Sequence, residues 1–179
     1  MRKRLLLIIF SLCAGFLFAQ KNKAYTDSLN KFRADYIASH EVVTGDNKKN
    51  FRFFPIDRSF SVQADFEESK DKPEVKFKTF AGFGQRYLLY GKLHFKYKGR
   101  PYQLSVYFSP KESTMEKYKD HLFIPFTDLT NGNLTYGGGR YVDILTTDIK
   151  NGKVIIDFNK NYNPWQTLFS AKSPGGDVA

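Results

Sequence analysis

Apolar and polar residues alternate in several short runs, and this alternation constrains the fold more than any other feature. Every second residue is apolar between Ser59 and Phe66, and the pattern recurs from Lys92 to Lys98 and from Tyr102 to Phe108. Side chains two residues apart share one face of a strand, so each run predicts a strand with one buried face. With the other apolar runs and the turn residues between them, they predict a mainly β fold, an antiparallel sandwich or barrel of about seven or eight strands.

One segment has the spacing of a helix instead. Between Lys21 and Ser39, the apolar residues Leu29, Phe32 and Tyr36 recur every three or four positions. This periodicity predicts one N-terminal helix. The alternative for this segment is a mobile arm that precedes the strands.

The first residues have the pattern of a secretory signal peptide. Arg2-Lys3-Arg4 forms a positively charged start, Leu5 to Phe18 is almost entirely apolar, and the small Ala19 precedes Gln20. We therefore predict a signal peptide at 1–19, a single β-rich domain at 20–179, and a periplasmic or secreted location after cleavage. The protein then meets the membrane only through this signal peptide. The alternative is an N-terminal anchor that is not cleaved.

Cysteine usage and charge exclude several classes of function. Cys13 is the only cysteine and leaves with the signal peptide, so no cysteine nucleophile or disulfide is predicted. The 28 Lys and Arg residues include three in the signal peptide, so 25 basic residues face 18 acidic ones and the net charge falls from +10 to +7. The lysines are scattered, and we predict no nucleic-acid partner. Asp128 begins a loop whose fifth residue is glycine and whose twelfth is not acidic, which argues against a calcium site. Neither a metal ion nor a cofactor is predicted.

Three consecutive glycines precede an arginine in the most informative stretch, which runs from Leu122 to Pro164. Gly137, Gly138 and Gly139 allow close backbone approach, and backbone N–H groups in such a turn can surround an anion. Arg140 adds a planar charged group suited to a carboxylate or phosphate. The run therefore predicts an anion-recognising loop. The alternative is a tight turn in which Arg140 forms a salt bridge with Asp143 or Asp128.

An Asn151-Gly152 pair predicts a hairpin between the runs 141–149 and 153–158. The second run contains three consecutive apolar residues, 154–156, which predicts a strand covered on both faces. Asp157 and Asn159 point to the same face if that strand continues, and Asp143 lies on the predicted partner strand. We therefore expect Asp143, Asp157, Asn159 and Arg140 to form a cluster. The alternative is a buried ion pair that fixes the strand register.

Three segments together resemble a bacterial family known as domain of unknown function 1684. They are Phe53 to Asp57, Leu122 to Asp143, and Asp157 to Pro164. The resemblance implies no activity, because the family has none established. The positions that match the family pattern are Asp128, Thr130, Tyr136, Gly138, Arg140, Tyr141, Asp157, Asn159, Tyr162 and Asn163. The tail at 165–179 departs from the family, whose members continue with a cysteine-containing segment and a closing strand.

Binding of a small anionic or sugar-like ligand is the first functional hypothesis, at the Gly137–Arg140 loop and the Asp157/Asn159 strand. Tyrosine side chains supply flat apolar surfaces with a polar tip. The predicted ligand-binding residues are Asp128, Tyr136, Gly138, Gly139, Arg140, Tyr141, Asn159 and Tyr162.

Two other hypotheses come from different classes of protein. The chain is a hydrolase if Asp157 or Asp143 acts as acid or base, with Arg140 as electrostatic stabiliser and His121 as proton carrier. It is an interaction protein of the cell envelope if its basic surface and its helix bind a partner. The sequence leaves open whether the protein is an enzyme and what its oligomeric state is.

Overall fold

The computed structural model describes residues 2–41, 43–77 and 86–163, with side chains from residue 20 onward. The chain divides into two compact units, Met1–Ile56 and Asp57–Ala179, and each is described by itself. The atypical tail at 165–179 lies outside the described residues.

The first unit contains the long helix α1 (Arg2–Ser39), which includes the helix predicted from Lys21 to Ser39, and the short turn η1 (Gly45–Asn50). Aromatic rings pack where α1 ends. The Tyr36 ring lies 5.3 Å from His40, 5.7 Å from Phe51 and 6.4 Å from Phe53, measured between ring centroids. Among the described helices, none is long and apolar enough to cross a membrane.

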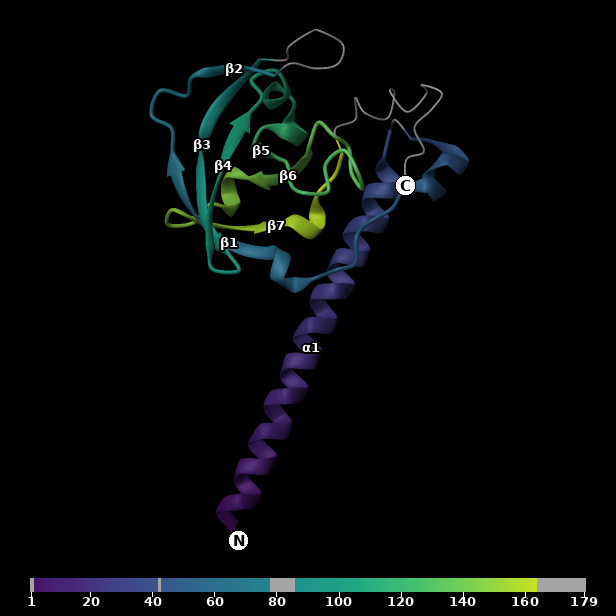
Figure 1. The fold of residues 1–179 in the computed structure, drawn as a ribbon, viewed down its shortest axis with the longest axis vertical. Helices are drawn as coiled ribbons and strands as arrows, with labels where there is room; N and C mark the ends of the chain where they lie inside the picture. Colours follow the sequence, from purple (N-terminus) through teal and green to yellow (C-terminus); the bar gives the residue numbers. More distant parts are fainter. Residues whose placement is uncertain (1, 42, 78–85, 164–179) are drawn as a thin grey trace. The chain divides into compact units, whose positions relative to one another are not determined.

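The second unit is an antiparallel sheet curled into a half-barrel, which confirms the predicted mainly β class (Figure 1). Along the sheet the strand order is β6-β5-β4-β3-β1-β7, and β2 pairs with β3 beside this path. The strands in the described residues are β1 (Ser61–Glu68), β2 (Glu74–Lys76), β3 (Arg86–Tyr97), β4 (Arg100–Phe108), β5 (His121–Phe126), β6 (Arg140–Leu145) and β7 (Lys153–Asp157).

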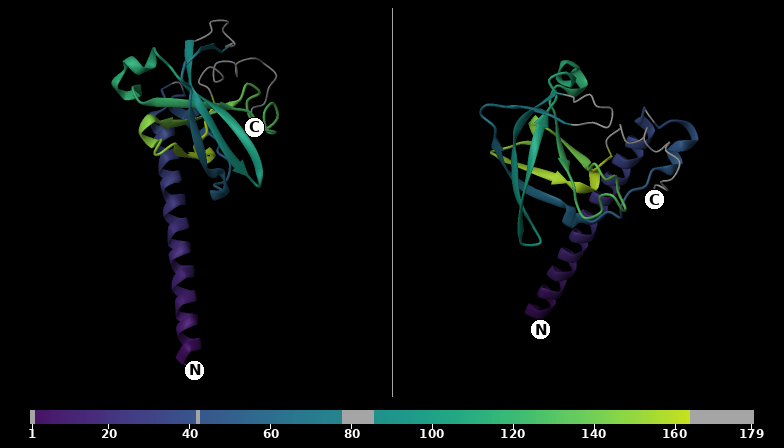
Figure 2. Two further views of the ribbon diagram at one scale, coloured as in Figure 1. Left: turned by 90° about the vertical axis from the view of Figure 1, so that its left-hand side faces the viewer. Right: turned by 45° about the horizontal axis from the view of Figure 1, so that its top comes forward.

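The alternating runs form the strands that they predict. The runs from Ser59 and Lys92 belong to β1 and β3, and β3 and β4 form a long hairpin in which Tyr97 pairs with Arg100. The strands curl around a common interior (Figure 2). Their inward residues, together with those of β5, β6 and β7, make one apolar core. Its buried members are Val62, Ala64, Leu93, Val106, Leu122, Ile124, Val142, Ile144, Val154 and Ile156.

The hairpin predicted around Asn151-Gly152 is wrong beyond its turn. Asn151 and Gly152 adopt positive φ values of 52° and 70°, as the turn requires, but only Lys150 and Lys153 pair across it. β7 instead pairs with β1 over its whole length, and β6 pairs with β5. β6 and β7 therefore occupy opposite ends of the strand order, and Asp143 is not on the partner strand of Asp157.

The prediction that β7 is covered on both faces is also wrong. Val154 and Ile156 are buried in the core, whereas Ile155 between them is 57% exposed. Nor does the strand continue to Asn159, because the 3-10 turn η6 (Phe158–Lys160) follows Asp157. The chain then reaches the other end of the sheet, where Tyr162 pairs with Tyr141 of β6. The segment after β7 thus links the two edge strands of the half-barrel.

Candidate functional site

The predicted site residues lie in three separate groups, and the alternation of β6 accounts for much of this separation. Arg140 is buried on the same face of β6 as the core residues Val142 and Ile144. Tyr141 and Asp143 occupy the intervening positions and point to the opposite face. Arg140 and Asp143 therefore do not meet, although they are three residues apart.

Arg140 belongs to the first group, at the base of the loop that joins β5 to β6. Its guanidinium forms an ion pair with Asp128, and Nη1 donates a hydrogen bond to Asn161 Oδ1 at 3.1 Å. Nη2 also lies 3.4 Å from the hydroxyl oxygen of Thr130. The guanidinium carbon stands 5.1 Å from the centroid of the Phe126 ring. Arg140 is only 6% exposed, so its charge interacts with the protein's own residues, in the β5–β6 loop and in the segment after η6.

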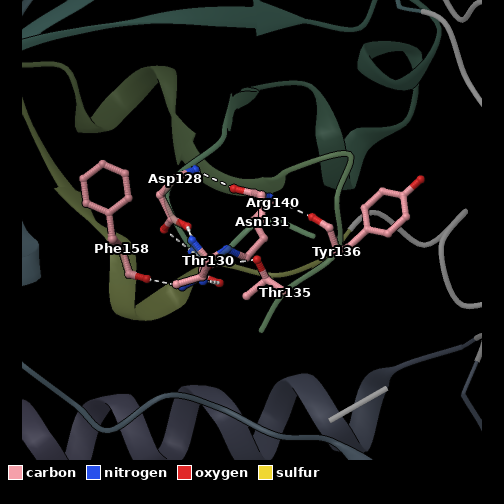
Figure 3. A network of polar contacts seen from close by, with 8 residues as sticks. Asp128, Thr130, Asn131, Thr135, Tyr136, Arg140 and Phe158 are labelled. Atoms are coloured by element: carbon pink, nitrogen blue, oxygen red, sulfur yellow. Dashed lines mark hydrogen bonds and ion pairs between the residues drawn. The ribbon is translucent and has the colours of Figure 1, made fainter. Parts of the chain in front are cut away.

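The Asp128 carboxylate organises the loop itself (Figure 3). It accepts hydrogen bonds from the backbone N–H of Thr130 at 2.9 Å and from the Thr130 hydroxyl at 2.5 Å. Burial acts to raise the pKa of Asp128, but the hydrogen bonds from Thr130 and the charge of Arg140 outweigh it and lower the pKa. Asp128 thus stays ionised and holds the start of the loop against Arg140.

Of the three glycines, Gly139 occupies the position that tolerates a side chain least. Its φ of +101° suits glycine, and a Cβ there would stand 2.8 Å from the carbonyl oxygen of Phe126. Its N–H donates to the Tyr136 carbonyl at 3.2 Å, so this N–H is engaged within the loop. A Cβ on Gly138 would meet the Tyr136 ring, whereas Gly137 has ordinary space around it.

Asp157 and Asn159 form the second group, which ties together distant parts of the chain. The Asn159 side-chain oxygen accepts from the Asp57 N–H at 3.0 Å, and its Nδ2 donates to the Asp57 carbonyl at 2.8 Å. Asp157 Oδ1 accepts from the Asn159 N–H at 3.0 Å and from its Nδ2 at 2.8 Å. Asn159 is 6% exposed, so this group fastens the segment before β1 to the end of β7.

The third group brings together His121, Tyr141, Asp143 and Tyr162, which we call the β5–β6 cluster. Asp143 holds it together: Oδ2 lies 3.1 Å from His121 Nε2, and Oδ1 accepts from the Tyr162 hydroxyl at 2.7 Å. Tyr141 and Tyr162 exchange two backbone hydrogen bonds of 2.9 and 3.0 Å, and their rings meet edge to face at 5.9 Å. Four residues predicted separately as catalytic or ligand-binding thus share one face.

Partial exposure makes the β5–β6 cluster chemically usable. The side chains of His121 and Asp143 are 22% and 33% exposed. The hydrogen bond to Asp143 raises the pKa of His121, burial opposes this, and the charges of Asp143 and Glu112 add to the increase. The imidazole therefore holds a proton to higher pH than a free histidine does.

Aromatic rings from neighbouring strands surround the cluster. Phe123 lies on the same face of β5 as His121. The centroid of its ring is 5.5 Å from that of Tyr141, 5.7 Å from that of Tyr107 and 4.7 Å from that of Tyr87. Burial, the nearby Glu112 and Tyr141 raise the pKa of Tyr87 to about 12, so its hydroxyl stays neutral. Sequence reasoning missed Phe123 and Tyr87 as neighbours of the cluster. The signal in the sequence was the two-residue spacing of His121 and Phe123.

An open depression of about 400 Å³ lies elsewhere on the second unit, and none of the predicted site residues lines it. It is bordered by Phe66, Glu68, Tyr90, Thr146, Ile149 and Gly152. Among the residues the structure describes, no group of three or more His, Cys, Asp or Glu side chains is arranged to hold a metal ion.

The fold and the third group define a class: a small antiparallel β half-barrel with a polar and aromatic cluster on the face of β5 and β6 away from the core. The model of one protein family, described as Protein of unknown function (DUF1684), matches residues 48–172. The chain belongs to this family, which confirms the resemblance seen in its sequence.

One solved structure shows the same fold. It is the solution NMR structure of an uncharacterized protein of Haloarcula marismortui, 24% identical to this chain, with a TM-score of 0.60. The alignment covers 82% of this chain and 82% of that one. No curated protein matches the chain.

Proposed function

We propose that the second unit binds a small sugar-like ligand at the β5–β6 cluster. The observation that carries this proposal is the Asp143 carboxylate, which contacts His121 and the Tyr162 hydroxyl while a third of its side chain stays exposed. A carboxylate held in place by two partners is ready to accept hydrogen bonds from ligand hydroxyl groups.

The combination of groups suits a sugar. Sugars present hydroxyl groups beside apolar C–H patches, and binding sites for small molecules combine aromatic side chains with a few well-placed polar groups. The cluster offers the rings of Tyr141 and Tyr162 next to a carboxylate and an imidazole. Asp143 disfavours an anion at this position, whereas the hydroxyl groups of a neutral sugar can donate to it. A neutral, polyhydroxylated ligand is therefore the better match.

The Gly137–Arg140 loop and the Asp157/Asn159 strand are weaker placements for a ligand. The buried Arg140 is engaged with Asp128, Thr130 and Asn161, so an anion must displace at least one of these contacts. Asn159 uses its side-chain oxygen and its Nδ2 to hold Asp57. Both sites are costly to open, because a displaced buried polar group loses its partner.

The test is a thermal-shift and NMR titration of the full chain with neutral monosaccharides and disaccharides, sugar acids and inorganic phosphate. We expect a neutral sugar to raise the Tm of the wild type, because a ligand that binds only the folded state stabilises it. Tyr141→Ala and Asp143→Asn are expected to abolish this increase. Tyr136→Ala, in the β5–β6 loop, is the matched control and keeps it.

One outcome contradicts the placement of the site, and another contradicts sugar binding itself. If Tyr136→Ala abolishes the increase and Tyr141→Ala does not, the ligand binds at the glycine loop. If no compound changes the Tm or any resonance of the cluster, the unit is not a sugar-binding module.

A hydrolase is the second candidate, and the contact between His121 and Asp143 favours it. A carboxylate that orients an imidazole is a recurring arrangement for a general base. In this version Asp143 acts through His121, because Arg140 lies on the other face of β6. Release of nitrophenol from nitrophenyl glycosides and esters tests it: turnover that His121→Asn abolishes supports a hydrolase, and equal turnover in both proteins contradicts one.

We also propose that the chain is exported to the periplasm or the exterior, where small sugars are available to a binding protein. The charged residues 2–4 followed by the apolar run 5–18 support export. An envelope protein partner is the competing role. It predicts a stable complex from cell extracts and no response to small molecules.

A further inference from the structure

The loop between β5 and β6, residues 127–139, carries three exposed apolar side chains. Leu129 is fully exposed at 102%, Leu134 is 54% exposed and Tyr136 is 37% exposed. Figure 3 shows the Tyr136 ring pointing away from the polar network of the loop. Single exposed apolar residues are ordinary, but three within eight positions of one loop form a concentrated apolar tip.

The polar groups of the same loop are directed inward. The Thr130 carbonyl accepts hydrogen bonds from the N–H groups of Asn133, Leu134 and Thr135, at 3.2, 2.9 and 3.0 Å. The hydroxyl groups of Thr130 and Thr135 lie 3.0 Å apart, and the Gly132 N–H donates to the Thr135 carbonyl at 2.9 Å. Many of the polar groups that a loop usually gives to water are therefore bonded within it.

Side-chain amides complete this internal network. Asn131 accepts from the Asp128 N–H at 2.5 Å and donates to the Tyr136 carbonyl at 2.7 Å. No residue from Leu129 to Gly139 carries a charge, and the flanking Asp128 and Arg140 neutralise each other. Unpaired charges and unsatisfied hydrogen-bonding groups are the main obstacle to burial in an apolar phase. Removing the tip from water leaves no charge unpaired and few hydrogen bonds unmade.

We propose that the β5–β6 loop contacts lipid and inserts the side chains of Leu129, Leu134 and Tyr136 into the interfacial region of an anionic bilayer. This contact goes beyond the proposed sugar site and beyond the N-terminal segment. Tyrosine is favoured at the boundary between water and lipid, because its ring is apolar and its hydroxyl is polar. The leucines supply the apolar area that enters the bilayer.

The small size of the tip and the net charge of the chain favour lipid over a protein partner. A stable protein interface needs roughly 20 residues on each side, which the tip alone does not provide. A few apolar side chains and an electrostatic attraction are the usual pair of signals for reversible membrane binding. The chain without its predicted signal peptide carries a net charge of +7, with 25 basic and 18 acidic residues, and this charge favours anionic lipid.

The experiment reads the environment of the loop itself, so that binding through the N-terminal segment does not confuse it. In the full chain, Cys13→Ala removes the only native cysteine, and Leu134→Cys then carries an environment-sensitive fluorophore. Ile155→Cys, an equally exposed position on β7, provides the matched control label. The labelled proteins are mixed with vesicles of phosphatidylcholine, with and without phosphatidylglycerol.

We expect the label at position 134 to shift its emission to the blue with anionic vesicles and to be quenched by lipid-attached quenchers. The label at position 155 is expected to show neither change. Leu129→Ser, which leaves the Asp128 and Arg140 contacts in place, is expected to weaken both signals at position 134 severalfold. High salt is also expected to weaken them, since it screens the attraction to anionic lipid.

Three outcomes overturn the proposal. The first is a label at position 134 that keeps its aqueous emission while the protein sediments with vesicles, because the loop then stays in water. The second is an absence of binding to either kind of vesicle. The third is a blue-shifted label before lipid is added that vesicles do not change, which shows that another protein segment or a second copy covers the loop.

Discussion

Arg140 and Asp143 lie three residues apart on β6, and their side chains have different partners. Arg140 faces the core side. It connects the β5–β6 loop, through Asp128, to the segment after η6, through Asn161. Asp143 faces the other side and joins His121 to Tyr162. At this scale Arg140 is a structural residue, and Asp143 is the centre of the proposed ligand site.

The first prediction concerns the stability that Arg140 provides. Arg140→Ala is expected to lower the free energy of unfolding by roughly 2–3 kcal/mol, because it leaves Asp128 and Asn161 without their buried partner. Urea unfolding measures this change. Arg100→Ala, at an exposed position that begins β4, is the control and is expected to change stability by less than about 0.5 kcal/mol. A similar loss in both variants contradicts the prediction.

The second prediction concerns the pH dependence of stability. Because Asp143 raises the pKa of His121 in the folded state, the protonated histidine stabilises the protein. This contribution is fully present below the unfolded pKa of about 6.5 and is lost as the pH rises through the higher folded pKa. Urea unfolding from pH 5 to 9 is expected to show this loss in the wild type and not in His121→Gln.

His94→Gln serves as the control for that experiment. His94 contacts Glu67 at 2.9 Å on the exposed side of the sheet, where ion pairs contribute little to stability. The variant is therefore expected to keep the wild-type pH profile. If His121→Gln also keeps the wild-type pH profile, Asp143 does not stabilise the charged imidazole.

At the scale of elements, the β5–β6 loop behaves as a preformed unit rather than as a slack connection. Its base is the ion pair of Asp128 and Arg140, and its interior is the hydrogen-bond network centred on Thr130. This preformed structure favours the proposed lipid contact, because a disordered loop would lose more conformational entropy when it binds.

The third prediction separates the glycines of this loop. Gly139→Ala is expected to lower the free energy of unfolding by roughly 1–3 kcal/mol, because its φ is +101° and the added Cβ would stand 2.8 Å from the Phe126 carbonyl. Gly137→Ala meets no atom closer than 3.8 Å and is expected to be neutral or slightly stabilising. Denaturant unfolding of the two variants decides this, and equal effects contradict a special role for Gly139.

At the scale of the whole molecule, the chain combines an N-terminal helical unit with a β half-barrel unit. In the structure, α1 continues across the bond between Ala19 and Gln20, where the sequence predicts cleavage. Cleavage there leaves a shorter helix on the mature protein, from Gln20 to Ser39.

The fourth prediction is that the exported protein begins at Gln20. We expect the charged start and the apolar run to direct the chain to the export machinery, and the small Ala19 to permit cleavage. Mass spectrometry of protein from the periplasm or medium gives its N-terminal residue. A protein that remains in the membrane fraction with residues 1–19 attached supports the uncleaved anchor instead.

The pattern of side chains was enough to predict the class of fold. Alternation located β1, β3 and β4, and helical spacing located the second half of α1, because burial of one face imposes a local period on each element. The sequence also contained the ion pair of Arg140 and Asp128 as one of two alternatives. It did not choose between them, because Asp128 and Asp143 are both within reach along the chain.

The sequence by itself determined the mainly β class, the positions of β1, β3 and β4, the turn at Asn151-Gly152 and the resemblance to the family. Only the tertiary structure decided which strands are neighbours. It paired β7 with β1 instead of β6, exposed Ile155, and divided the expected cluster of Arg140, Asp143, Asp157 and Asn159 into three groups. The physical reason is that alternation fixes the face of each residue, whereas strand order depends on contacts between residues far apart in the chain.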